Sequence, residues 1–189
     1  APSANRFGRV SPTHAEHVVD EFDGQVWVLD GDAAVIGIES TIVDLTTGVA
    51  RILRFGHITP QDIERVTGVA PILPANTGEQ TPRVSGSLLA HYAPNTPLIW
   101  QDEALEITQS ESVLLAHSSN IADQYYQYTV HLPDDAIGYA RGLYRALREL
   151  DDYQARQIVV ERLPDDEAWY AVQDRLNRAV VGSNCLEKN

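Results

Sequence analysis

Cysteine is nearly missing from this 189-residue sequence, methionine is absent, and no long apolar run occurs. The single cysteine, Cys185, has no disulfide partner in the chain and no neighbouring histidine to activate it as a nucleophile. A lone thiol favours a reducing, cytoplasmic location. No stretch approaches the roughly 18 apolar residues that a membrane-spanning helix requires, so no membrane segment is predicted.

Methionine is missing even from position 1, where the chain opens with the turn-forming string APSAN. Natural amino termini are usually loose polar lead-ins to the first element. This start predicts that the sequence begins inside a domain of a longer protein, with an unusual processed start as the alternative.

Basic side chains are scarce as well. The sequence has 14 lysines and arginines against 27 aspartates and glutamates, which gives a formal net charge of −13. Nonspecific nucleic-acid binding depends on a basic surface, so this balance disfavours direct RNA binding. With 43% hydrophobic residues, the chain can bury the core of one large domain or two small ones.

The common metal and phosphate motifs are also absent. The sequence has no CxxC pair, no HxxxH pair with an acid, no GxxxxGK[ST] loop and no GxGxxG after a strand. No metal site is therefore predicted. A nucleotide site would have to be built from other groups, and the residues alone leave the catalytic groups unknown.

The first region, residues 1–68, alternates short apolar runs with turns. Apolar residues at helical spacing predict a helix over residues 14–22. Either Ser11 or Thr13 could cap this helix, and Pro12 suits its first turn.

Three further elements are predicted in the same region. The string QVWVLD, residues 25–30, indicates a buried strand. Residues 40–45 and 49–54 are typical of two strands joined in a hairpin by the turn TTG. A short helix over residues 59–66, closed by Gly68, follows the hairpin.

Residues 69–97 change character, because they contain five prolines and show little periodicity. A segment of this length without regular structure is either a linker or a functional lid. We interpret it as a linker that also serves as a lid.

Residues 98–181 alternate strands with helices, which predicts an α/β domain with a mainly parallel sheet and helices on its faces. The expected strands cover residues 98–100, 113–116, 128–132 and 157–163, and the expected helices cover residues 134–150 and 165–181. In the first helix Ile137 belongs to the apolar face, and Arg141, Arg145 and Arg148 share the solvent face. Residues 182–189 are predicted to form a tail.

Small polar residues at turns and strand ends form the one chemical pattern that remains: Ser3, Asn5, Ser11, Ser40, Thr41 and Arg54. Hydroxyls, backbone N–H groups and a strand-end arginine are good ligands for phosphate or carboxylate. Each residue also has a structural interpretation, as turn former, helix cap or surface ion pair. Spacing alone therefore supports only a weak anion site.

Six strings in register resemble a known family: APSAN, SPTHAEHVVDEFDG, VLDGD, GIESTIVDL, ARILRFGHIT and SGSLLAHYAPNTPL. The first five are similar to the second half of the YrdC domain. The last resembles the segment that joins this domain to the extra carboxy-terminal domain of the long L-threonylcarbamoyl-AMP synthases. The tail strings YARGLYRALRELD, IVVERLP and AVQDRLNRA resemble that extra domain.

This resemblance implies an enzyme that joins L-threonine, bicarbonate and ATP into threonylcarbamoyl-AMP and pyrophosphate, for threonylcarbamoyladenosine modification of tRNA. It implies the carboxy-terminal part of a YrdC-like domain over residues 1–68, the proline-rich linker over residues 69–97, and a small Rossmann-like domain over residues 98–181. Magnesium would accompany ATP, held by the nucleotide rather than by a protein cage. Proteins of tRNA modification would act downstream.

The resemblance also implies roles for single residues. ATP is expected to contact Ser3, Ser11, Arg54 and Tyr92. Threonine is expected to contact Ala1 and Ser40. Asn5 and Thr41 are weaker candidates, Asn5 being better suited to fixing its own loop. Without the resemblance, Tyr92 would be interpreted as a tyrosine packed between domains.

Three further expectations concern the activity of the chain alone, an alternative function and the role of residues 98–181. The chain alone is expected to be inactive, since the basic residues of the first half of the catalytic domain lie outside it. An RNA-binding, translation-factor-like module is the alternative function. Residues 98–181 contain no recognisable catalytic set, so this domain is expected to act as a scaffold, lid support or docking surface.

Overall fold

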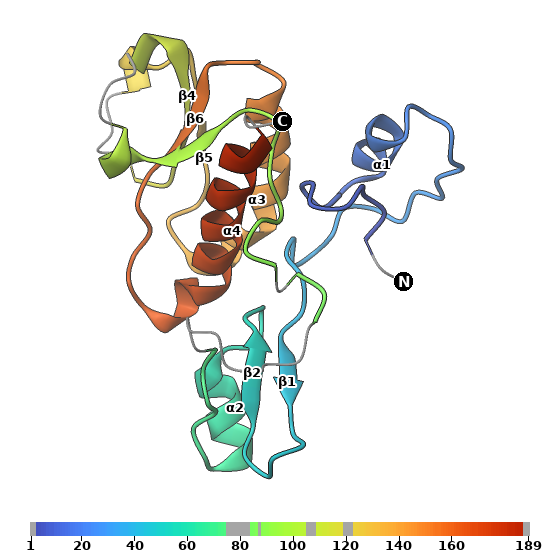
Figure 1. Cartoon of the computed structure of the whole chain (residues 1–189), viewed down its shortest axis with the longest axis vertical. Helices are drawn as coiled ribbons and strands as arrows, with labels where there is room; N and C mark the ends of the chain where they lie inside the picture. Colours follow the sequence, from blue (N-terminus) through green and yellow to red (C-terminus); the bar gives the residue numbers. More distant parts are fainter. Residues whose placement is uncertain (1–2, 75–83, 87, 105–108, 119–122, 187–189) are drawn as a thin grey trace.

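The largest unit of the structure is a four-stranded parallel sheet in the carboxy-terminal half of the chain. This computed structural model describes residues 3–74, 84–86, 88–104, 109–118 and 123–186 (Figure 1). The strands are β3 (Leu98–Trp100), β4 (Ser112–Ala116), β5 (Tyr128–His131) and β6 (Gln157–Val160). Their order is β3-β6-β4-β5, and every neighbouring pair is parallel. The predicted α/β class with a parallel sheet is confirmed.

Two long helices, α3 (Ala136–Asp151) and α4 (Tyr170–Leu186), pack on one face of this sheet. Leu143 of α3 and Leu176 of α4 are fully buried in the same core cluster as Val113 of β4. Burial of a leucine of this kind contributes about 1.5–3 kcal/mol, so this shared core is what joins the helices to the sheet.

The opposite face of the sheet carries a smaller cluster formed by Leu114, Ala116 and Val159. Helices on both faces were expected, and this expectation is wrong for the described residues. In their described residues, the connections on either side of β4 form single turns of 3-10 helix: η1 (Gln101–Glu103), η2 (Gln109–Glu111) and η3 (Asp123–Tyr125). Turns of this length are too short to cover the face of a sheet.

Helix α3 differs from its predicted pattern at two positions. Ile137 is 68% exposed, and the buried face of the helix begins after it, at Tyr139 and Ala140. Arg148 does not lie on a solvent face, since its guanidinium forms an ion pair of 3.1 Å with the buried Glu21 of α1 (Ala15–Glu21). A second layer therefore packs against the outer side of α3.

Helix α1 begins later than predicted and uses a different start signal. Its N-cap is His14, without a side-chain cap, so neither Ser11 nor Thr13 caps the helix and Pro12 precedes it. The Thr13 N–H group instead donates to Nδ1 of the buried His17, at 3.1 Å. The His17 side chain, in the first turn of α1, thus accepts a backbone N–H group that precedes the helix.

The predicted strand over residues 25–30 is wrong, because no strand forms there. Trp27 and Leu29 are fully exposed, at 104% and 97%. The backbone of the segment has no neighbouring strand among the described residues. A strand needs a paired neighbour to satisfy its N–H and C=O groups, so alternation alone does not create one.

The predicted hairpin and the helix after it are confirmed. Strands β1 (Ile42–Asp44) and β2 (Arg51–Arg54) are antiparallel, with Val43 opposite Ile52. The helix, α2 (Pro60–Thr67), begins with a reciprocal capping box between Thr59 and Asp62 and ends at Gly68. Gly68 has φ 74°, a left-handed conformation that favours glycine at a helix end.

The segment before β3 lies between the amino-terminal region and the long helices. Ala93 N–H donates to the Gly8 carbonyl at 2.9 Å, and His91 N–H donates to the Arg178 carbonyl at 3.3 Å. In the described parts of residues 69–97, no helix or strand longer than a single bridge forms. Of the described helices, none has the length and apolar character needed to cross a membrane.

Candidate functional site

A buried polar cluster lies where the amino-terminal region meets α3 and α4. We call it the Glu39 cluster, and it consists of Ser11, Glu39, Tyr144 and Arg175. Glu39 Oε1 accepts a hydrogen bond of 2.7 Å from Ser11 Oγ. Glu39 Oε2 accepts bonds of 2.8 Å from Tyr144 Oη and from Arg175 Nε. Residues up to 164 positions apart in the sequence therefore meet on one carboxylate.

Charge and hydrogen bonding fix the protonation state of Glu39. Burial alone would raise the pKa of this carboxyl group, but Arg175 and the donors around it outweigh that effect and hold the pKa below its usual value. Burial raises the pKa of the Tyr144 hydroxyl, and the Glu39 charge raises it further. The cluster is thus a carboxylate that accepts from a neutral tyrosine and from an arginine cation.

Arg54 is the predicted phosphate ligand, and the structure shows it engaged with the backbone. Its side chain donates to the Ser40 carbonyl from Nε at 3.1 Å and from Nη2 at 2.8 Å, and from Nη1 to the Ser85 carbonyl at 2.9 Å. Arg54 is 6% exposed. The Arg54 guanidinium therefore joins the end of β2 to Ser40 and to Ser85, which precedes β3 in the chain.

The two expected threonine contacts at this place differ in what their side chains do. Ser40 is exposed, and its hydroxyl lies 3.4 Å from Arg54 Nη2. Thr41 Oγ1 donates to the Ile58 carbonyl at 2.7 Å, so its proton is held by the protein. Of the two neighbours, Ser40 is the one with a hydroxyl proton available for a ligand. Ala1 lies outside the described residues.

Ser3 and Ser11 line the same cavity of about 360 Å³, together with Glu39 and Tyr144. Ser3 is exposed, whereas Ser11 is 5% exposed and points its proton at Glu39. Asn5 lies apart from this cavity and holds its own loop, because its Nδ2 donates to the carbonyls of Arg6 and Arg9. The structure thus brings Ser3 and Ser11 together and leaves Asn5 aside.

Tyr92 lies between the amino-terminal region and the long helices. Its ring is stacked 5.7 Å from that of Tyr144, and the Arg175 guanidinium lies 5.2 Å from its centroid. The residue is 1% exposed and has φ 61°. Tyr92 thus packs against Tyr144 of α3 and Arg175 of α4. This agrees with the interpretation of Tyr92 as a packed tyrosine, which was favoured without the family resemblance.

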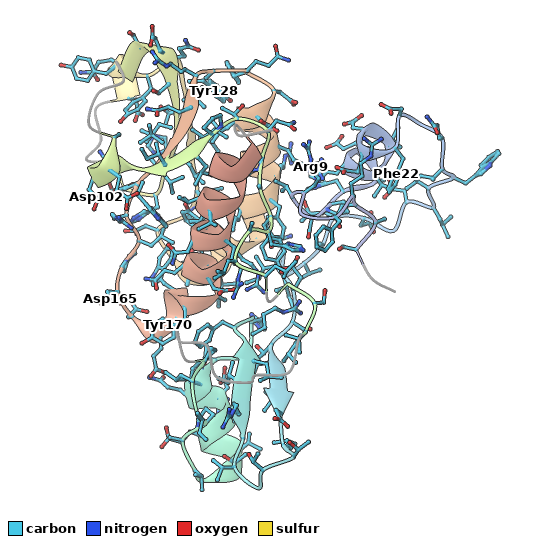
Figure 2. All side chains as sticks on the ribbon, in the orientation of Figure 1. Arg9, Phe22, Asp102, Tyr128, Asp165 and Tyr170 are labelled. Carbon is cyan, nitrogen blue, oxygen red and sulfur yellow. The ribbon has the colours of Figure 1, made fainter. Side chains whose placement is uncertain are left out.

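The second half of the chain approaches the hairpin at one further point. Figure 2 shows Tyr170 at the end of α4 nearest to β1 and β2, and its ring centroid lies 5.2 Å from that of Phe55. Arg175 Nη2, one turn further along α4, donates to the Phe55 carbonyl at 2.9 Å. The first turns of α4 therefore contact the residue that follows Arg54.

Glu39, Tyr144 and Arg175 were not singled out from the sequence. One signal could have indicated Arg175: it lies between Val172 and Leu176 on the apolar face of its helix. A charged residue in a buried stripe requires a charged or hydrogen-bonding partner. That partner, Glu39, lies 136 residues before Arg175 in the sequence, and no local pattern around Arg175 identifies it.

One group of side chains has the composition of a metal site. Ligand atoms of His14, Glu16 and His17 lie within 4.8 Å of one another. However, His17 Nδ1 accepts a hydrogen bond from Thr13 N–H, so its proton lies on Nε2 and its lone pair is already used. Metal binding through this histidine would require the bond from Thr13 to break.

His17 also makes the stability of the chain dependent on pH. Burial, with a further contribution from Arg148, lowers the pKa of His17 to about 4. The unfolded state therefore binds the proton first as the pH falls below 6.5, and the folded state loses stability between pH 6.5 and 4. Between pH 7 and pH 5 we expect a loss of about 1–2 kcal/mol from this histidine.

Urea unfolding of the wild type and of His17→Asn at both pH values measures this effect. The asparagine oxygen replaces Nδ1 as an acceptor but does not titrate, so the variant should lose less stability on acidification. His57→Asn, at an exposed histidine, is the matched control and should behave like the wild type. An equal pH dependence in all three proteins would contradict the prediction.

Comparison with known proteins gives a consistent result. Residues 58–180 match the family model described as threonylcarbamoyl-AMP synthase, C-terminal domain. Residues 1–56 match the model described as telomere recombination, which covers Sua5, YciO and YrdC. The chain is 32% identical to the threonylcarbamoyl-AMP synthases of Pyrococcus abyssi and Bacillus subtilis over 196 aligned residues each. It is 25% identical to that of Schizosaccharomyces pombe.

Solved structures agree with these matches. The crystal structure of P. abyssi Sua5 complexed with L-threonine superposes with a TM-score of 0.79 at 30% identity, covering 97% of this chain and 58% of that one. The three curated relatives are covered over 95–96% of this chain but only 51–57% of their own lengths. The chain thus spans just over half the length of the proteins that it matches.

Proposed function

Because this chain belongs to the threonylcarbamoyl-AMP synthase family, we propose that it is part of an enzyme that makes L-threonylcarbamoyl-AMP from L-threonine, bicarbonate and ATP. The product would supply the threonylcarbamoyl group for tRNA modification. One observation carries the proposal: the fold superposes over 97% of the chain on a relative complexed with L-threonine. The Ser40 hydroxyl and the Arg54 guanidinium, which lie next to Glu39 in the chain or in space, are chemically suited to such ligands.

The proposal divides the chain into functional parts. Residues 1–68 would be the carboxy-terminal part of a YrdC-like catalytic domain, residues 69–97 the linker and lid, and residues 98–181 a Rossmann-like accessory domain. The start of the parallel sheet at Leu98 supports the second boundary, whereas the two family models meet earlier than the first, between residues 56 and 58. The predicted tail over residues 182–189 is wrong in its first part, because α4 extends to Leu186.

The ligand contacts follow from the positions of the hydroxyls. Ser40 is exposed beside Arg54 and would bind threonine, and Ala1 would be a second contact. Ser3 and Ser11, which line one cavity, would lie on the ATP side. Arg54 would bind a phosphate by exchanging its backbone carbonyl partners for phosphate oxygens. Asn5 and Thr41, whose polar groups already hold the protein, would serve the loops instead.

The chemistry requires positioning more than proton transfer by this part of the protein. Bicarbonate loses hydroxide to give carbon dioxide, and the threonine amine adds to its carbon and gives up one proton, so that a carbamate and water form. A carbamate oxygen then forms a bond to the α-phosphorus, and the bond to the pyrophosphate leaving group breaks. Arginine and hydroxyl donors aimed at these oxygens stabilise the developing charge. Magnesium would be bound by the phosphate oxygens of ATP and by water rather than by a set of protein carboxylates.

Tyr92 would act on the ATP side through the linker. Its ring contacts Tyr144 and Arg175, and its hydroxyl lies against Gly86, whose φ is 76°. A Cβ at Gly86 would overlap the Tyr92 hydroxyl and approach Arg54 Nη1 to 3.4 Å. The linker residues around Gly86 would therefore close over the nucleotide together with Tyr92.

The 189 residues alone would not complete a turnover. The Arg54 guanidinium is already engaged with the carbonyls of Ser40 and Ser85, and that of Arg175 is engaged with Glu39. A triphosphate carries several negative charges that these two side chains do not neutralise. The matched relatives are nearly twice as long, and the additional residues would supply the remaining positive groups.

Pyrophosphate release by the full natural polypeptide that contains these residues tests the proposal. We expect release only when L-threonine, bicarbonate and ATP are all present, and little release from residues 1–189 alone. Release that does not depend on threonine would contradict the proposal. Tight, salt-dependent RNA binding in a filter assay would favour an RNA-binding function instead, which a net charge of −13 disfavours.

A further inference from the structure

Arg175 connects the parallel-sheet unit to four of the proposed ligand residues, directly or through their neighbours. Its side chain is completely buried. Its Nε donates to Glu39, the residue before Ser40, at 2.8 Å, and its Nη2 donates to the carbonyl of Phe55, the residue after Arg54, at 2.9 Å. Arg175 therefore contacts the immediate neighbours of two proposed ligands.

Two further proposed ligands, Tyr92 and Ser11, are joined to the same arginine. Its guanidinium lies 5.2 Å from the centroid of the Tyr92 ring. Ser11 is reached through Glu39, whose second carboxylate oxygen accepts the serine proton at 2.7 Å. Tyr144 of α3 completes the arrangement by donating to Glu39 at 2.8 Å. Helix α3 thus holds the Glu39 carboxylate as well as α4 does.

We infer that Arg175 and Tyr144 are positioning residues, which fix Glu39 and thereby hold Ser11, Ser40 and Arg54 in the geometry that binds ATP and threonine. The ligand roles in this inference rest on the proposed function. Arg175 is completely buried and does not meet the reacting atoms. It acts through the hydrogen bonds that it donates to the chain around them.

The shape of the arginine side chain explains why this position requires arginine. Its planar fork donates in several fixed directions at once, here to the Glu39 carboxylate, the Glu39 carbonyl, the Phe55 carbonyl and Asp174. A lysine retains the positive charge but cannot reach all these acceptors from one nitrogen. The residues beside Ser40 and Arg54 would then lose their common partner.

The matched test compares two buried glutamates, each paired with an arginine of a long helix. Glu39→Gln weakens the pair with Arg175. Glu21→Gln weakens the 3.1 Å pair with Arg148, which also donates to the carbonyl of Val10, the residue before Ser11, but contacts neither Ser40 nor Arg54 nor Glu39. Both substitutions remove one buried negative charge across the same boundary. They should therefore lower thermal stability by similar amounts while differing at the site.

We expect Glu39→Gln to raise KM for ATP and threonine about tenfold in the full natural polypeptide, and Glu21→Gln to change KM less than about twofold. Arg175→Lys should behave like Glu39→Gln, because it keeps the charge and loses the fork. Equal KM values for the two glutamine variants, whether raised or unchanged, would overturn the inference.

Hydrogen–deuterium exchange of the same variants gives a second measurement that does not depend on activity. We expect faster exchange over residues 40–44 and 51–55 in Glu39→Gln than in Glu21→Gln or the wild type. If the wild type releases no threonine-dependent pyrophosphate, the proposed function fails, and the exchange result still decides the inference. Identical exchange in the two variants would overturn it.

Discussion

Replacing Gly56 with alanine is expected to reduce threonine-dependent turnover by about 100-fold or more. A Cβ at this position would lie 2.7 Å from the Glu39 carbonyl oxygen and closer still to backbone atoms of Ser40 and Thr41. These are main-chain atoms, which cannot rotate away as the end of a side chain can. The substitution must therefore displace residues 39–41, which carry the cluster carboxylate and the proposed threonine contact.

The measurement is kcat/KM for threonine in the full natural polypeptide, together with urea unfolding. Forced overlap of this kind costs about 1–3 kcal/mol, so the variant should still fold in a protein of ordinary stability. Gly31→Ala is the matched control, because a Cβ there meets nothing within 4 Å. An active Gly56→Ala variant would contradict the proposed position of the threonine site.

Arg54→Lys is the second substitution with a large expected effect. Lysine retains the charge but cannot donate twice to the Ser40 carbonyl while also holding the Ser85 carbonyl. If Arg54 binds a phosphate, the loss of the fork also weakens that contact. We expect KM for ATP to rise at least about tenfold, with a further loss of kcat if the linker no longer closes.

Steady-state kinetics at varied ATP would detect this change. Arg65→Lys is a suitable control, because Arg65 is a largely exposed arginine that pairs with Asp62, three residues before it on α2. Surface pairs of this kind contribute little, so the control should retain the wild-type KM. If Arg54→Lys also retained it, Arg54 would neither bind a phosphate nor hold the linker for ATP.

Local sequence patterns predicted those parts of the fold whose stabilising interactions are local or strongly periodic. The hairpin around TTG, the helix after Thr59 and the strands of the parallel sheet all form where they were expected. In each case the pattern and the tertiary contact agree: apolar strand residues such as Leu115 are completely buried. The class of the fold follows from the alternation of strands and helices.

Predictions failed where the deciding partner lies far away in the sequence, or where the described residues offer no partner strand. Alternation over residues 25–30 indicated a strand, but a strand needs a neighbour to pair with, and Trp27 is exposed instead. Arg148 has the spacing of a solvent-facing residue, yet Glu21 lies 127 residues before it and gives it a buried partner. Pattern methods detect periodicity and not such partners.

The candidate site shows the same division. Turn chemistry and family resemblance predicted Ser11, Ser40 and Arg54 as ligands, and the structure places all three close to Glu39 while their ligand roles stay predictions. The carboxylate and the arginine that join them were not identified, since Glu39 and Arg175 meet only through the packing of α4 on the amino-terminal region. The arginine on an apolar helix face was the available signal for a buried partner.

The identity of the product tests the central claim most directly. The full natural polypeptide would be incubated with L-threonine, ATP and ¹³C-bicarbonate, and the nucleotide products would be analysed by mass spectrometry. We predict an adenylate that contains threonine and one ¹³C atom, formed together with one pyrophosphate. Formation of free AMP or ADP alone, with no adenylate containing threonine and the labelled carbon, would contradict the proposed function.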